Sequence, residues 1–402
     1  MRMIRAVAIM LALTVTITLV GCVSYVDLSD RAIVQAIGID YLPDKKVYRI
    51  SMQYFNQSSE GGQNQIDKTQ DNVLKSVGEG ESIFAAAKNA SMLTGKDLLL
   101  SENRLIIIGK ELRKYKLCDT LEFFVGNYHS HPQAYVAAAE DTAEELLDIR
   151  FKEGSTSSQR LANLIHNASV ESRNKSTYPY QVMTMLCTST ESAFLPLLTT
   201  ATLKTDVTIP KETGGGKGNG GGEEQSEDGE KTIILDGGVV FKGGKELCRV
   251  DDDGAMAIFF MNDMPSEYSF TVPLGQNAKP SVMLIGVTRS IKATEYNGKV
   301  KFDVSFSASG KIGSKGGMKE DEKKAAEKVA EPAERELKRK IESSMIPIAE
   351  KGCDVFGLEN TLRRCCNRFY RENMDRVGEI IAESEIEVNV NIDIFSQGIG
   401  GA

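Results

Sequence analysis

The sequence of 402 residues contains no tryptophan, and aromatic residues make up only 7% of it. Small-molecule sites are usually lined by apolar and aromatic groups, so this scarcity disfavours a sugar-binding protein. Long apolar runs are also scarce. One run lies at the N-terminus, and no second run approaches the roughly 20 residues that a spanning helix needs.

The motifs of common enzyme classes are missing as well. The seven cysteines contain no Cys-x-x-Cys pair, so neither a zinc ribbon nor a thioredoxin-like site is indicated. No Gly-x-Ser-x-Gly marks a hydrolase. The glycine-rich stretch Gly214–Gly222 lacks the Gly-Lys-Ser/Thr and the preceding strand of a P-loop. We therefore expect a protein that is not an enzyme and has no cofactor.

Two short stretches could hold a metal. His129 and His131 would share one face of a strand, but zinc sites draw three or four ligands, and no carboxylate or cysteine lies nearby in sequence. Asp251, Asp252 and Asp253 precede Gly254 without the twelve-residue spacing and closing Glu of an EF-hand. We expect two solvated histidines and an acidic turn, and no metal site. His166 is expected in the last turn of a helix, where a cation suits the dipole.

The N-terminal apolar run has the parts of a secretory signal. Arg2 and Arg5 precede an uncharged run from Ala6 to Val20, and small Gly21 precedes Cys22. Leu-Val-Gly-Cys resembles a bacterial lipobox, in which Cys22 receives a diacylglyceryl group and the chain is cut before it. Two or more acyl chains anchor a protein stably to a bilayer. An ordinary signal peptide with a chance cysteine and an uncleaved membrane anchor are the alternatives.

Composition and charge suit a globular protein outside the membrane. Hydrophobic residues make up 41% and charged residues 26%, enough for real cores. The net charge is −8, and loss of Arg2 and Arg5 with the signal lowers it by two, to −10. This balance disfavours nucleic acid and anionic lipid as direct partners. The other cysteines permit disulfides outside the cytoplasm, but a chain of this size does not need them, and buried free thiols are expected; they are Cys118, Cys187, Cys248, Cys353, Cys365 and Cys366.

Strand and helix patterns are mixed along the chain without strict βαβ alternation, which predicts an α+β fold. Residues 48–54 alternate as a strand after the apolar run 32–39, while 105–108 and 134–139 are predicted as buried strands. Helical spacing is found at 83–95, 143–149, 159–166, 179–187, 333–350 and 356–369. Hairpins are predicted at 233–250 and 281–306, and the closing strand 385–395 is expected to pair with the longer one.

A flexible linker divides the chain. The linker is predicted at residues 206–231. From 211 to 231 it carries two glycine triplets and an acidic cluster without a large apolar residue, so it cannot offset its ordering entropy. We therefore expect a signal peptide at 1–21, an N-terminal domain at 22–205, a small middle β-rich domain at 232–278 and a C-terminal domain at 279–402. Each domain is expected to be an antiparallel or mixed sheet with helices packed on it.

Five stretches in order resemble the Ger(x)C family, the lipoprotein C subunits of nutrient germinant receptors in spore-forming bacteria. They are AIVQAIGID (32–40), GEGESIFAAA (78–87), LIIIGKEL (105–112), DGGVVFKGGKEL (236–247) and DVFG (354–357). The chain departs from the family pattern in two ways. It lacks the tryptophan usual after the lipid cysteine and another near the end, and its linker is longer.

The resemblance implies three α+β domains on the outer face of the spore inner membrane, anchored through Cys22. It also implies a non-enzymatic role in partnership with the membrane-embedded A and B subunits of the receptor. From the residues alone, a solute-binding lipoprotein that feeds a transporter remains the alternative, and it would need a deep cleft between domains. A lipid-tethered hydrolase is a third reading.

Overall fold

The computed structural model describes residues 3–5, 10, 30–55, 73–115, 117–126, 130–151, 156–203, 230–275 and 278–395. Most of the predicted signal segment, together with Cys22, His129 and residues 206–229 of the predicted linker, lies outside the described residues. The last two residues predicted as linker, Glu230 and Lys231, belong to a strand.

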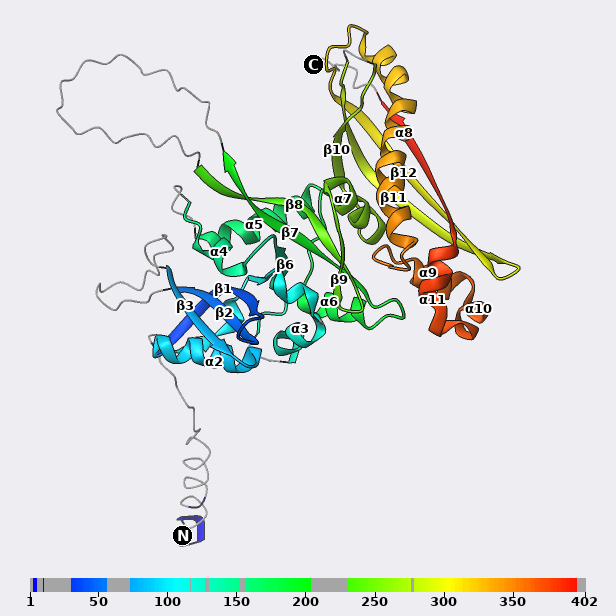
Figure 1. The fold of residues 1–402 in the computed structure, drawn as a ribbon. Helices are drawn as coiled ribbons and strands as arrows, with labels where there is room; N and C mark the ends of the chain where they lie inside the picture. The colour runs from blue at the N-terminus through cyan, green and yellow to red at the C-terminus, as the bar shows by residue number, and fades with distance from the viewer. Residues whose placement is uncertain are drawn as a thin grey trace, which may run out of the picture.

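The described strands form two sheets, which lie side by side in Figure 1. The larger has nine strands in the order β3-β2-β1-β5-β6-β7-β8-β9, with β4 paired to β1. These strands are β1 (Arg31–Leu42), β2 (Val47–Phe55), β3 (Val73–Gly80), β4 (Asp97–Leu99), β5 (Leu105–Ile108), β6 (Tyr135–Ala139), β7 (Ser192–Leu203), β8 (Glu230–Lys242) and β9 (Lys245–Val250). The smaller sheet has the order β10 (Glu267–Thr271), β11 (Ser281–Tyr296), β12 (Lys299–Ser314), β13 (Glu385–Ile394).

The larger sheet is mixed. Its central strands β1, β5, β6 and β7 run parallel, and the outer pairs are antiparallel. The predicted pairing of the first two strands is confirmed, because β1 and β2 are antiparallel partners. The buried central strands read as continuous apolar runs, as expected for parallel strands covered on both faces. In β5, Ile106 and Ile108 face one core while Leu105 and Ile107 face the other.

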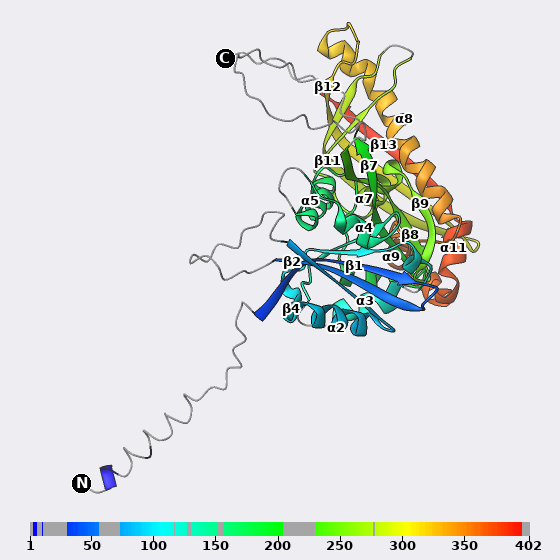
Figure 2. The same cartoon turned by 60° about the vertical axis from the view of Figure 1, so that its left-hand side comes forward.

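Helices cover both faces of this sheet, and Figure 2 shows α2 and α3 on one face with α4 and α5 on the other. Buried residues of α2, α3 and α6 join one core, and those of α4 and α5 join the second. We call the described residues 31–250 the N-lobe. Its helices are α2 (Ile83–Thr94), α3 (Leu117–Gly126), α4 (Ala143–Asp148), α5 (Ser157–Val170) and α6 (Pro179–Leu186), with short 3-10 turns η3 (Leu100–Glu102) and η4 (Glu111–Lys114).

The second sheet carries its helices on one face, as expected for alternating strands with one buried side. We call the described residues 252–395 the C-lobe. The predicted pairing of the last strand with the long hairpin is confirmed, since β13 runs parallel to β12 from Lys301↔Glu385 to Gly310↔Ile394. Its helices are α7 (Asp252–Asn262), α8 (Glu322–Ala349), α9 (Leu358–Cys365), α10 (Asn367–Glu372) and α11 (Val377–Glu383), with the 3-10 turn η5 (Met374–Arg376).

The α+β fold class is confirmed, with mixed sheets and packed helices. The segment 232–278, expected as a middle domain, has no sheet of its own in the described part of the chain. Strands β8 and β9 extend the N-lobe sheet, and β10 edges the C-lobe sheet. The reason is that an unpaired strand edge favours the addition of another strand. Strand β8, which follows the linker, pairs antiparallel with β7, which precedes it, and so continues the N-lobe sheet.

Three helices differ from the sequence prediction. The acidic triplet does not form an isolated turn, because Asp251 caps α7 and Asp252 and Asp253 lie in its first turn. Helix α8 begins at Glu322, not near Pro332, because an apolar stripe through Ala325, Val329 and later residues stays buried across the proline. The predicted helix 356–369 is broken at Cys366, whose backbone has φ −124° and ψ 49°.

Candidate functional site

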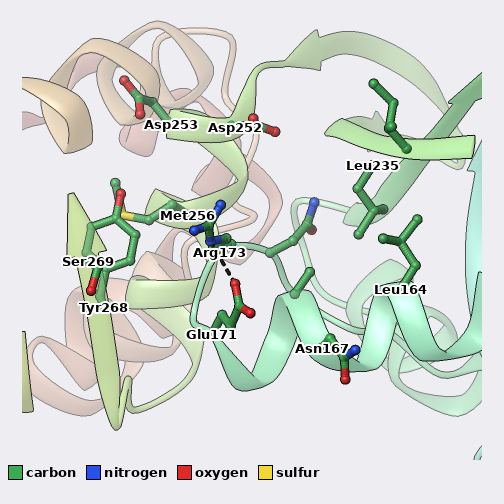
Figure 3. A pocket seen from close by; sticks show the side chains of 13 residues that line it. Leu164, Asn167, Glu171, Arg173, Leu235, Asp252, Asp253, Met256, Tyr268 and Ser269 are labelled. Carbon is green, nitrogen blue, oxygen red and sulfur yellow. Dashed lines mark ion pairs between the residues drawn. The ribbon is translucent and has the colours of Figure 1, made fainter. Parts of the chain in front are cut away.

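A cavity of about 530 Å³ lies between the lobes (Figure 3). Its N-lobe wall comes from the end of α5 and from β8, and its C-lobe wall comes from α7 and β10. Figure 3 shows Leu164 and Leu235 on one side and Tyr268 on the other. The lining residues are Leu164, Asn167, Ala168, Glu171, Arg173, Asn174, Ile234, Leu235, Asp252, Asp253, Met256, Tyr268 and Ser269.

The charged groups of this cavity are mostly engaged within the protein. Glu171 pairs with Arg173 at 2.9 Å, as the dashed line in Figure 3 marks. The Oδ1 of Asp252 accepts from the backbone N–H of Gly237 at 3.0 Å, and Asp253 pairs with Lys340. No histidine, cysteine or lysine is among the lining residues.

Tyr268 forms the aromatic wall of the cavity. Its ring stacks on Phe270 with centroids 5.7 Å apart and meets Phe260 edge-on at 5.2 Å. Burial raises the pKa of the Tyr268 phenol well above its ordinary value, and the nearby Asp253 carboxylate adds to the shift. The phenol is thus held in its neutral form.

The other predicted site residues are not brought together as a metal site. His131 lies in a turn before β6 rather than on a strand, and its Nδ1 accepts from the backbone N–H of Gln133 at 3.1 Å. His166 lies near the end of α5, where its Nδ1 shares a hydrogen bond of 3.0 Å with the Tyr135 hydroxyl. In the described residues no cluster of three His, Cys, Asp or Glu side chains suits a metal ion.

The cysteines of the described chain are free thiols. Cys353 is buried, and burial raises the pKa of its thiol to about 11. Cys187 and Cys365 are exposed, so the expectation of buried thiols is wrong for these two. Cys22, the predicted lipidation site, lies outside the described residues, and lipidation there stays a prediction.

Two of the sequence motifs meet at Asp40, whose role sequence reasoning missed. Its carboxylate accepts from the backbone N–H groups of Ala143 at 2.8 Å and Glu144 at 3.0 Å, at the start of α4. A side chain at Gly109 would place its Cβ 1.9 Å from the Asp40 carboxylate. Burial raises the pKa of Asp40, while the two backbone hydrogen bonds oppose the shift. AIVQAIGID and LIIIGKEL thus join three segments of the N-lobe core.

The GEGES motif is a packing site for α2. A Cβ at Gly78 would lie 2.3 Å from the Ala86 carbonyl oxygen, so only glycine lets the helix approach β3 this closely. Ser82 caps the helix by accepting from the backbone N–H of Ala85 at 3.1 Å. Glu79 pairs with Arg49 at 2.6 Å on the neighbouring strand. The motif thus fixes a helix onto a sheet edge.

The DVFG motif joins the two lobes. Asp354 is buried and accepts from the backbone N–H groups of Leu358 at 2.8 Å and Glu359 at 2.7 Å, which caps α9. Its own N–H donates to the Ser192 hydroxyl of the N-lobe at 2.9 Å. Burial raises the pKa of the Asp354 carboxyl. The Asp-x-x-Gly spacing before an amphipathic helix is the signal that could have predicted the cap.

A second buried carboxylate, Glu359, lies at the same contact between the lobes. Its Oε1 accepts from the Ser189 backbone N–H at 3.2 Å and from the Tyr370 hydroxyl at 3.0 Å. Lys175 and Asp263 add an ion pair of 2.6 Å between the lobes. The core also crosses the boundary, since Phe194 and Val240 of the N-lobe pack in the C-lobe core. The two lobes are thus held together by polar contacts and by a hydrophobic core to which both contribute.

Comparisons with known proteins agree with this architecture. Residues 24–200 match the family model described as spore germination protein N-terminal domain. Residues 236–398 match the model described as spore germination B3/GerAC like, C-terminal. Among solved structures, the crystal structure of the GerBC protein is similar with a TM-score of 0.51 at 13% identity, covering 89% of this chain and 96% of that chain. No curated protein sequence matches the chain.

The two matched segments and their α+β fold define a two-lobed spore germination protein. The chain belongs to the Ger(x)C family of spore germination proteins. The resemblance predicted from the five motifs is confirmed, and membership supports a role as a germinant receptor C subunit. Within the described residues, no helix combines the length and apolar character needed to cross a membrane.

Proposed function

We propose that the chain is the lipid-anchored C subunit of a nutrient germinant receptor and works without catalysis, by docking with the membrane A and B subunits. The observation that carries this proposal is the match of both halves of the chain to spore germination family models. The motif residues support it, because Asp40, Gly109 and Asp354 serve internal packing and capping. These residues hold the fold in place, and its surface is left for docking.

The location in this proposal is the outer face of the spore inner membrane, with Cys22 carrying a diacylglyceryl group. The mature chain has a net charge of −10 once Arg2 and Arg5 are lost, which suits a protein partner better than nucleic acid. A lipid anchor confines the lobes near the membrane subunits, so docking takes place at a high effective concentration.

Replacing Cys22 tests the anchor and its importance. Cys22→Ala is expected to abolish lipid labelling in the native organism and to slow nutrient germination of its spores. The exposed Cys365 provides a matched control, and Cys365→Ala should leave both measurements unchanged. Labelling of the Cys22→Ala protein at the wild-type level would refute the anchor. Germination at the wild-type rate without labelling would show that the anchor is dispensable.

Solute capture is the second candidate function, and the cavity between the lobes is the observation that favours it. Titration calorimetry of the purified chain with amino acids and sugars separates the two functions. The docking proposal predicts no heat of binding at micromolar concentrations. Saturable micromolar binding, lost when Tyr268 in the cavity wall is replaced by Ala, would favour a protein that feeds a transporter.

A further inference from the structure

Helix α2 exposes an apolar face to solvent. Its inner side packs on the sheet through Ile83, Ala86, Ala87 and Ala90. On the outer side, Phe84 is 66% exposed, Met92 70% and Leu93 75%. The outer face of a surface helix is normally polar, and large exposed apolar patches mark sites of interaction. The outer face of this helix is therefore an apolar surface suited to an interaction.

The two ends of α2 differ in charge. From Ile83 to Lys96 the chain has two lysines, Lys88 and Lys96, and no acidic residue. The first end, at Phe84, lies in a groove with three carboxylates, Glu81, Asp119 and Glu122. At the second end, the adjacent apolar side chains Met92 and Leu93 lie near Lys88 and Lys96, and the exposed Asp97 follows Lys96. Apolar side chains beside lysines suit the interface of an anionic bilayer.

The second end of α2 also lies where the chain enters the N-lobe. Strand β4 follows the helix after Gly95 and Lys96, and its first residue, Asp97, pairs with Arg31 at the start of β1. Figure 2 shows the start of β1, β4 and α2 at the same end of the N-lobe. Arg31 follows Cys22 by nine residues, which span at most about 30 Å. An anchor at Cys22 would hold this end near the bilayer.

We propose that the membrane-facing patch, defined as Lys88, Met92, Leu93 and Lys96, rests on the lipid bilayer. Met92 and Leu93 enter the boundary between headgroups and acyl chains, and the two lysines face the phosphates. The inference rests on the lipid anchor of the proposed function. It adds a second contact, which fixes how the lobes are oriented above the membrane instead of leaving them to swing on the tether.

The absence of tryptophan makes this contact measurable, because a single introduced tryptophan is the only indole reporter. Met92→Trp places it in the patch. Phe395→Trp is the control, since Phe395 directly follows β13, at the end of the molecule opposite α2 in Figures 1 and 2. The acylated full-length chain is reconstituted in vesicles of phosphatidylglycerol and phosphatidylcholine with brominated acyl chains. Flotation with the vesicles reports the anchor, and quenching of emission reports the depth of each reporter.

The expected result is that both variants float, that the Met92→Trp emission shifts to the blue and is quenched, and that the Phe395→Trp emission is not. Adding Leu93→Glu to Met92→Trp should remove the quenching and leave flotation intact. If both proteins float and neither reporter is quenched, or both are quenched equally, the patch is refuted while the anchor stands. If the chain does not float, the anchor fails and the patch fails with it.

Discussion

Asp40 and Asp354 each bring separate segments of the chain together. Each buried carboxylate accepts hydrogen bonds from two or more backbone N–H groups at the start of a helix. Asp40 of β1 does so at α4, and Asp354 does so at α9. An unsatisfied buried N–H costs about 1–3 kcal/mol, so these side chains are expected to matter for stability more than their number suggests. In the motifs they are paired with glycines that allow close approach, such as Gly109 beside Asp40.

At the same scale, Tyr268 makes stability depend on pH. Its raised pKa keeps the phenol neutral in the folded protein above pH 10, where the unfolded chain ionises. The free energy of unfolding therefore falls as pH rises above 10. Between pH 8 and pH 11, the free energy of unfolding should fall by about 1.4 kcal/mol less in Tyr268→Phe than in the wild type, as measured by urea unfolding at both pH values.

The matched control for this measurement is Tyr296→Phe, because the Tyr296 side chain is 77% exposed at the tip of the long hairpin. It should leave the loss between the two pH values as in the wild type. An equal loss in the wild type and in Tyr268→Phe would contradict the burial of a neutral phenol in the wall of the cavity.

Single residues were predicted unevenly from the sequence. The spacing of His129 and His131 argues against a complete set of metal ligands, and the expectation of no metal site stays a prediction. The capping role of Asp40 could not be predicted, because its partners lie far along the chain, 103 residues away in the case of Ala143. The role of Asp354 was missed, although its partners are local and the Asp-x-x-Gly spacing before α9 is a signal for it. The net charge of the chain also gave no indication of how lysines and apolar side chains are arranged at the end of α2.

At the scale of elements, α9 depends on its cap. Asp354→Ala would leave the backbone N–H groups of Phe356, Leu358 and Glu359 without their buried acceptor. We expect the free energy of unfolding to fall by about 3 kcal/mol or more, as measured by urea denaturation. Exposed Asp375→Ala, in the same lobe, should change it by less than about 0.5 kcal/mol. Equal effects of the two substitutions would contradict the capping role.

The elements that alternate in the sequence were predicted best. Strands at 48–54, 300–306 and 385–395 follow a period of two and are found as β2, β12 and β13. Helix α7 was missed because its residues Ala255–Met261 are buried all round, which removes the periodic signal. The start of α8 was misplaced because proline usually opens a helix, whereas Pro332 here lies inside one.

At the scale of the whole molecule, the two lobes form one body around the cavity and the buried carboxylates. The predicted middle domain could not be excluded from the sequence, because pairing between strands across a long linker leaves no local signal. The structure joins β7 to β8 over that linker and lets α7 pack against both β8 and α8. This arrangement suits a protein that presents fixed surfaces to its partners.

The central claim is that the protein acts by holding the membrane subunits of a receptor. The most direct measurement is affinity purification of the full-length chain from detergent-solubilised spore membranes, followed by mass spectrometry of the proteins that elute with it. We predict that two multi-pass proteins, the A and B subunits, elute with the wild-type chain in constant proportion. Recovery of the chain alone, together with saturable nutrient binding by the purified chain, would contradict the claim.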